Sequence, residues 1–129
     1  MGKRKNRTLL FKRVFEELFH ESDETLFYED MMDEMDEESI ATINADFNEL
    51  MSKKQELMDI VSKYSTDFDV SRIYKIDLAI LLVAIFELKY RLDTPNKVVI
   101  NEAVEIAKKY STDKSYSYIN GVLAKIISE

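Results

Sequence analysis

Hydrophobic residues recur at helical spacing along most of the chain. The first stripe consists of Phe11, Val14, Phe15 and Leu18. Its i, i+3, i+4, i+7 spacing predicts an amphipathic helix over about residues 4–20. Patterns of the same kind predict further helices over about residues 24–35, 40–63, 72–90, 97–110 and 115–128.

The helix expected at 72–90 contains the run Leu78–Phe86, which is apolar on nearly all faces, so this helix should be the central and most buried element. The whole sequence has two glycines and one proline, whereas a strand-rich fold needs many turns built from these residues. We therefore predict an all-α fold. The polar stretch YSTDFDVS predicts a boundary near residues 65–70 that separates two small helical bundles, an N-terminal lobe of about 1–66 and a C-terminal lobe of about 67–129.

Composition narrows the class of protein. The chain has 129 residues, 46% of them hydrophobic, which is enough for one domain with a real core. It has no cysteine, which excludes disulfides and thiolate metal sites. The longest apolar run has nine residues, about half the length of a membrane-spanning helix, and the basic start lacks the apolar region of a secretory signal. We expect a cytoplasmic protein that does not bind membranes.

Charge is distributed unevenly along this acidic chain, whose formal net charge is −7. Residues 1–13 carry six bases and no acid, whereas residues 14–69 carry 18 acids and three bases. The run ESDETLFYEDMMDEMDEE lacks the glycine and the regular ligand spacing of a calcium loop, which favours a solvated helix face. With a single histidine, His20, and no glycine-rich phosphate loop, the sequence predicts no enzyme, no metal site and no cofactor.

The bases of the first helix continue its hydrophobic stripe, because Arg4 and Arg7 lie nearly in line with Phe11. Unpaired arginines are not buried, so we expect the helix to extend beyond the core and to direct both guanidinium groups past its end. Guanidinium groups suit phosphate oxygens and guanine edges, and Lys3 and Lys5 add charge. Charge alone supports equally well a frayed basic terminus that serves only solubility. The acidic middle segment disfavours a membrane-surface helix.

The last predicted helix has a basic strip, because Lys114, Tyr118, Gly121 and Lys125 fall on one face. Such a strip can stack a base on the ring between phosphate contacts, although an ordinary exposed face with a half-buried tyrosine gives the same pattern. Glycine inside a helix costs about 1 kcal/mol relative to alanine. We expect that another helix passes too close to Gly121 for a side chain.

Two segments of the C-terminal half, KVVINEAVEIAKKY and YINGVLAKI, strongly resemble the NusB family of bacterial transcription antitermination factors. The central run AILLVAIFEL, preceded by Ile76 and Asp77, resembles the family's central helix, and the basic start with Arg7 resembles its first helix. The resemblance covers nearly the whole chain and is weakest over residues 21–60.

The resemblance implies an all-helical fold of two small bundles and a function in transcription. Family members bind the boxA sequence of single-stranded nascent RNA together with a small-subunit ribosomal protein, and they act on the RNA polymerase elongation complex indirectly, notably in ribosomal RNA operons. By position, the resemblance implies RNA-binding roles for Lys3, Arg4, Arg7, Phe15, Ser115, Tyr118 and Asn120. It places Asp77 on the side that faces the ribosomal protein.

The chain departs from the family pattern at positions that concern contacts rather than fold. Leu78 and Leu82 stand where the family often has arginines, and Lys114 and Thr8 stand where it usually has acids. A different class of function also fits the charge pattern: a helical protein-interaction module that does not bind RNA and docks a basic partner through its acidic segment.

Overall fold

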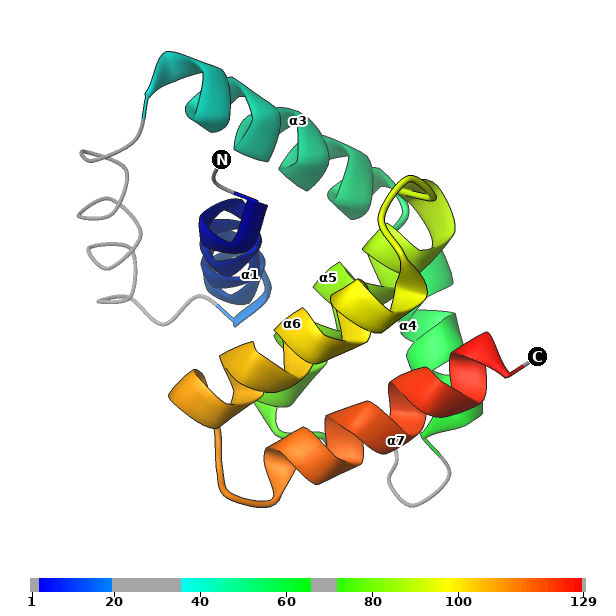
Figure 1. Cartoon of the computed structure of the whole chain (residues 1–129). Helices are drawn as coiled ribbons and strands as arrows, with labels where there is room; N and C mark the ends of the chain where they lie inside the picture. Colours follow the sequence, from blue (N-terminus) through cyan, green and yellow to red (C-terminus); the bar gives the residue numbers. More distant parts are fainter. Residues whose placement is uncertain (1–2, 20–35, 66–71, 129) are drawn as a thin grey trace. The chain divides into compact units, whose positions relative to one another are not determined.

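The computed structural model describes residues 3–19, 36–65 and 72–128, and these ranges contain helices and no strand (Figure 1). The helices are α1 (Lys3–Phe19), α3 (Glu37–Ser52), α4 (Lys54–Tyr64), α5 (Lys75–Tyr90), α6 (Asn96–Tyr110) and α7 (Ser115–Ile127). The predicted all-α class is confirmed. The helix expected at 24–35 lies outside the described residues.

The chain forms two compact units, Met1–Ser52 and Lys53–Glu129. The first contains α1 and α3, and the second contains α4 to α7, because α4 packs against α5 and α7. The lobe boundary expected near 65–70 lies almost entirely outside the described residues.

The first unit pairs α1 with α3. Apolar side chains on both helices are buried: Leu9, Leu10, Phe11, Val14, Ile43, Phe47 and Leu50. The guanidinium group of Arg13 lies 4.1 Å from the centre of the Phe47 ring, and it donates a hydrogen bond to the side-chain oxygen of Asn44. This cation is therefore part of the helix pairing.

The boundaries of α3 differ from the helix expected at 40–63. Asp36 accepts a hydrogen bond of 2.7 Å from the backbone N–H of Ser39, which caps a helix that already begins at Glu37. This bond also lowers the pKa of Asp36. At the other end, Lys53 has φ −111° and ψ 12° and separates α3 from α4, so the single long helix that we expected is two helices.

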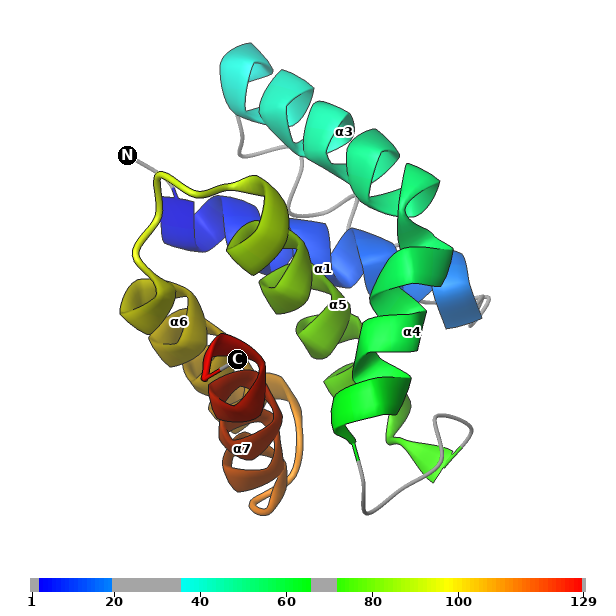
Figure 2. The same ribbon diagram turned by 90° about the vertical axis from the view of Figure 1, so that its right-hand side faces the viewer.

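Helix α5 is the centre of the second unit and packs on α4, α6 and α7 (Figure 2). Every residue from Asp77 to Phe86 is buried, which confirms that this helix is the most buried element described. Helices α6 and α7 form a hairpin through the turn at 111–114. No described helix has both the length and the apolar content needed to cross a membrane.

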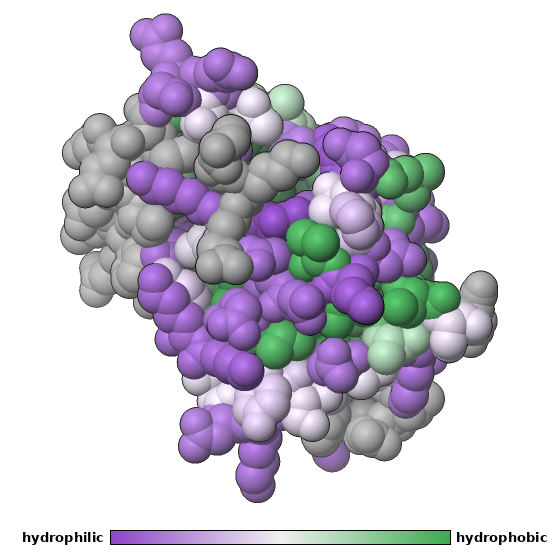
Figure 3. Space-filling model, in the orientation of Figure 1, coloured by the Kyte–Doolittle hydropathy of each residue, from purple (hydrophilic) through white to green (hydrophobic). Residues whose placement is uncertain are grey.

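The face of the second unit seen in Figure 3 has a mixed character. Hydrophobic groups are scattered among hydrophilic ones over α6 and α7 in Figure 3. The large hydrophobic side chains that remain exposed in the described part of the chain are Tyr74, Leu92, Val98, Tyr116 and Ile127.

The start of α4 is joined to the end of α5 through Glu56. Its Oε2 accepts a hydrogen bond of 2.5 Å from the Tyr90 hydroxyl and lies 2.9 Å from the Lys89 Nζ, while the Lys53 ammonium lies 4.6 Å from the centre of the Tyr90 ring. The hydrogen bond from Tyr90, followed by that from Lys89, lowers the pKa of Glu56 below its ordinary value of 4.5. A carboxyl whose pKa is lower in the folded state stabilises the fold above its unfolded-state pKa, and this contribution is lost as the pH falls through the folded-state pKa.

We therefore expect Glu56→Gln to lower the melting temperature at pH 7 by a small amount, because the carboxylate is largely exposed. At an acidic pH below the lowered folded-state pKa of Glu56, the difference from the unmodified protein should disappear, since Glu56 is then protonated in both states. Thermal unfolding at the two pH values measures this. Glu105→Gln, which removes an exposed carboxylate paired only with Lys108 on the same helix, is the control. An equal difference at both pH values for Glu56→Gln would contradict the assignment.

Candidate nucleic-acid interface

The bases of α1 have different environments. Lys5 is exposed, Phe15 is half-buried, and the side chains of Lys3 and Arg4 lie outside those described. Arg7 is only 8% exposed and takes part in an interaction within the protein. The expectation that Arg7 extends past the core is wrong, because a guanidinium group that has partners can be accommodated inside.

Lys12 is buried as well, at 7% exposure. Together with Arg13 on Phe47, these side chains show that much of the basic cluster belongs to the interior of the fold. Among the described cations of α1, Lys5 is the one that is exposed.

On α7, the four expected RNA contacts are split between surface and interior. Lys114, at the N-cap, and Asn120 are exposed, whereas Ser115 is buried. Tyr118 is half-buried, and its hydroxyl lies 2.5 Å from the Ser65 Oγ at the end of α4. This bond fixes the ring and engages its hydroxyl.

Gly121 has no close neighbour. Outside its own stretch of α7, a Cβ placed there would meet no described atom within 4 Å, so the expectation that another helix passes too close is wrong. Packing gives no reason for a glycine at this position.

A buried carboxylate links three helix ends. Asp77, in the first turn of α5, accepts a hydrogen bond of 2.5 Å from the Ser111 hydroxyl at the end of α6 and one of 2.9 Å from the Ser115 hydroxyl at the start of α7. Ser115 has one hydroxyl proton, which it gives to Asp77, so its Oγ accepts from the Ser111 and Thr112 hydroxyl groups, each 2.8 Å away. We call Asp77, Ser111, Thr112 and Ser115 the turn network.

The turn network sets the position of the α6–α7 turn, and Asp77 is only 5% exposed. Both carboxylate oxygens accept hydrogen bonds within the protein, and the contact of Asp77 with a partner protein stays a prediction. Sequence reasoning identified Asp77 and Ser115 but missed Ser111 and Thr112. The signal was present in Ser-Thr-Asp-Lys-Ser, which places hydroxyl groups three and four residues apart between two predicted helices.

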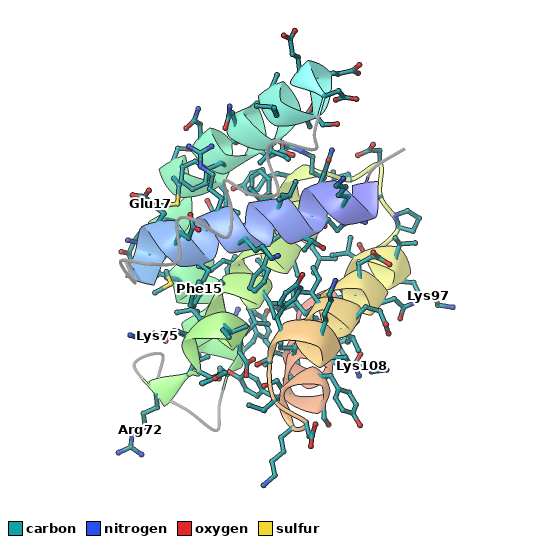
Figure 4. All side chains as sticks on the ribbon, turned by 90° about the vertical axis from the view of Figure 1, so that its left-hand side faces the viewer. Phe15, Glu17, Arg72, Lys75, Lys97 and Lys108 are labelled. Atoms are coloured by element: carbon teal, nitrogen blue, oxygen red, sulfur yellow. The ribbon has the colours of Figure 1, made fainter. Side chains whose placement is uncertain are left out.

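Sequence reasoning also missed the start of α5. Arg72, Tyr74 and Lys75 are all exposed there, and Figure 4 shows Arg72 and Lys75 extending outward from this end of the helix. In the sequence, this surface could have been recognised from a tyrosine that lies between two bases at the boundary of a predicted helix. Leu78 and Leu82, where the family often has arginines, are buried at 4% and 0% exposure.

The described residues contain no group of three or more histidine, aspartate or glutamate side chains that could hold a metal ion. The described residues define an all-helical protein of two compact units. The first unit has candidate binding residues on α1, and the second has them at the start of α5 and on the first turns of α7.

The NusB family model matches residues 4–128, and the chain belongs to the NusB family. The transcription antitermination protein NusB of Lachnoclostridium phytofermentans is 37% identical over 131 residues, which cover 98% of this chain and 99% of that protein. The NusB of Agathobacter rectalis is 38% identical over 130 residues, which cover 97% of this chain and 98% of that protein. The solved structure of NusB from T. maritima matches with a TM-score of 0.86 at 29% identity and covers 100% of this chain and 92% of that one.

Proposed function

We propose that this protein is a non-catalytic transcription antitermination factor that binds boxA-type single-stranded RNA together with a small-subunit ribosomal protein. The complex would act on the RNA polymerase elongation complex during transcription of ribosomal RNA operons. The observation that carries the proposal is family membership over nearly the whole chain, with relatives that are transcription antitermination proteins.

The environment of Tyr118 supports RNA binding on α7. The bond to Ser65 engages the hydroxyl, so the ring face is the part of Tyr118 suited to stack on a base. Open space at Gly121, one turn further on, lets a nucleic-acid backbone come near the helix. Lys114 supplies an exposed positive charge at the start of the same helix.

On α1, the burial of Arg7 changes its proposed role. Arg7 supports the fold from within, and the phosphate contacts of this helix fall to Lys3, Arg4 and Lys5. Phe15, which is half-buried, is the aromatic residue proposed for RNA contact on α1.

The test is a titration of a labelled boxA oligonucleotide and a scrambled control, with and without the ribosomal protein. We expect selective binding of boxA that the ribosomal protein strengthens. In the same titration, Arg4→Ala combined with Lys5→Ala should weaken binding about tenfold and lower the salt slope by about 0.7 for each lost phosphate contact. Lys54→Ala combined with Lys97→Ala removes two exposed cations elsewhere and should leave affinity nearly unchanged.

Failure to bind RNA under either condition would refute the proposal. It would favour the protein-interaction module that docks a basic partner through the acidic segment. If both double variants weakened binding equally, the role of α1 would be wrong, because net charge alone would then explain the effect.

A further inference from the structure

The start of α5 breaks a local rule of helix formation. The N-cap position favours serine, threonine, aspartate or asparagine, whose side chains accept a hydrogen bond from the first turn. Here the N-cap is Tyr74, which makes no such bond, and its side chain is 53% exposed. The N-cap residues of α4, α6 and α7 make no such bond either, so the feature that distinguishes Tyr74 is its large exposed ring.

The backbone of Tyr74 is held in place by its neighbours. Its carbonyl oxygen accepts a hydrogen bond of 3.0 Å from the N–H of Leu78, and the preceding residue, Ile73, is buried. Asp77, three residues further on, is held by the turn network. When such a residue binds a ligand, only its two side-chain torsions need to be ordered, because the backbone is already held.

Exposed cations lie next to Tyr74 in the sequence and in the neighbouring α6–α7 turn. Arg72 and Lys75 are exposed on either side of Tyr74 in the sequence, and their side chains extend from the same end of α5 (Figure 4). The bond between Asp77 and Ser115 places this end beside the α6–α7 turn, where Lys114 is exposed. One exposed acid, Asp113, lies in that turn.

We propose that Tyr74 is a stacking platform for one base of the bound RNA, with Arg72, Lys75 and Lys114 as the neighbouring phosphate contacts. The inference rests on the proposed function and adds a contact to it. Stacking on an aromatic ring tolerates any base, while cations beside the ring bind the backbone on either side of that base. A protein partner fits less well, because exposed lysines such as Lys75 and Lys114 are depleted at protein interfaces, whereas they are suited to phosphate groups.

The experiment measures affinity for the boxA oligonucleotide with the full-length protein and three variants of this surface. We expect Tyr74→Ala to weaken binding about fivefold or more and Tyr74→Phe to stay within about twofold, because stacking needs the ring and not the hydroxyl. Arg72→Ala combined with Lys75→Ala should lower the salt slope by about 0.7 per lost phosphate contact. The Lys54 and Lys97 double variant is the matched control, and circular dichroism checks that each variant is folded.

A second measurement locates the contact directly. After ultraviolet crosslinking of the complex, mass spectrometry should recover RNA attached to the peptide that contains Tyr74. Unchanged affinity of Tyr74→Ala, in a protein that binds boxA, would overturn this inference and leave the proposed function intact. Loss of binding to the ribosomal protein with unchanged RNA affinity would make the surface a protein contact and equally overturn it. If the unmodified protein does not bind RNA, both proposals fail.

Discussion

Phe86→Ala is expected to lower the free energy of unfolding by about 3–5 kcal/mol. Phe86 is only 1% exposed, near the end of α5. Its ring centre lies 5.8 Å from that of Tyr90, and the Arg91 guanidinium lies 4.7 Å from the Phe86 ring centre. Truncation leaves a cavity between helices and removes both contacts, and a loss of this size is a large part of the roughly 5–15 kcal/mol that stabilises a typical domain.

Denaturant unfolding followed by circular dichroism measures the effect. Leu92→Ala is the matched control, because Leu92 is 81% exposed and its truncation should change stability by no more than about 0.5 kcal/mol. Phe86→Leu should fall between the two, since leucine fills part of the space. If Leu92→Ala were as damaging as Phe86→Ala, the second unit would not be organised around α5 in this way.

The helices could be predicted because their hydrophobic spacing is a local property of the sequence. The patterns at 4–20, 97–110 and 115–128 correspond to α1, α6 and α7 with differences of about one residue at the ends. The break at Lys53 could not be predicted in the same way. The apolar stripe continues across it, and no glycine or proline marks it.

The candidate site was harder to predict, because exposure depends on residues distant in the sequence. Arg7 and Lys5 are both bases on α1, yet one is buried and the other exposed. Asp77 and Ser111 are separated by 34 positions, and only the folded second unit brings a carboxylate to the end of α6. Gly121 is a further example. A glycine inside a helix predicted a close neighbour, whereas the structure has open space at this position.

Asp77→Ala is expected to lower the free energy of unfolding by about 1–3 kcal/mol, because it leaves the buried Ser115 hydroxyl without its acceptor and removes one acceptor of the half-buried Ser111 hydroxyl. Asp77→Asn should lower it less, since it keeps the volume and one acceptor oxygen. A double-mutant cycle of Asp77→Ala with Ser115→Ala should give a coupling energy of at least about 0.5 kcal/mol, which two independent residues would not show.

The direction in which Asp77→Ala changes RNA affinity distinguishes two roles of the carboxylate, one through its charge and one through the turn network. If the carboxylate acts only through its charge, Asp77→Ala should strengthen RNA binding, because a negative charge is removed from near a polyanion. If the turn network holds Lys114 and Tyr118 in place, the same change should weaken binding, and we expect a loss of several-fold at a temperature where the variant is fully folded. Asp113→Ala, which removes an exposed acid from the same turn, should leave affinity unchanged or slightly higher. Equal strengthening by Asp77→Ala and Asp113→Ala would show that the turn network has no part in positioning the site.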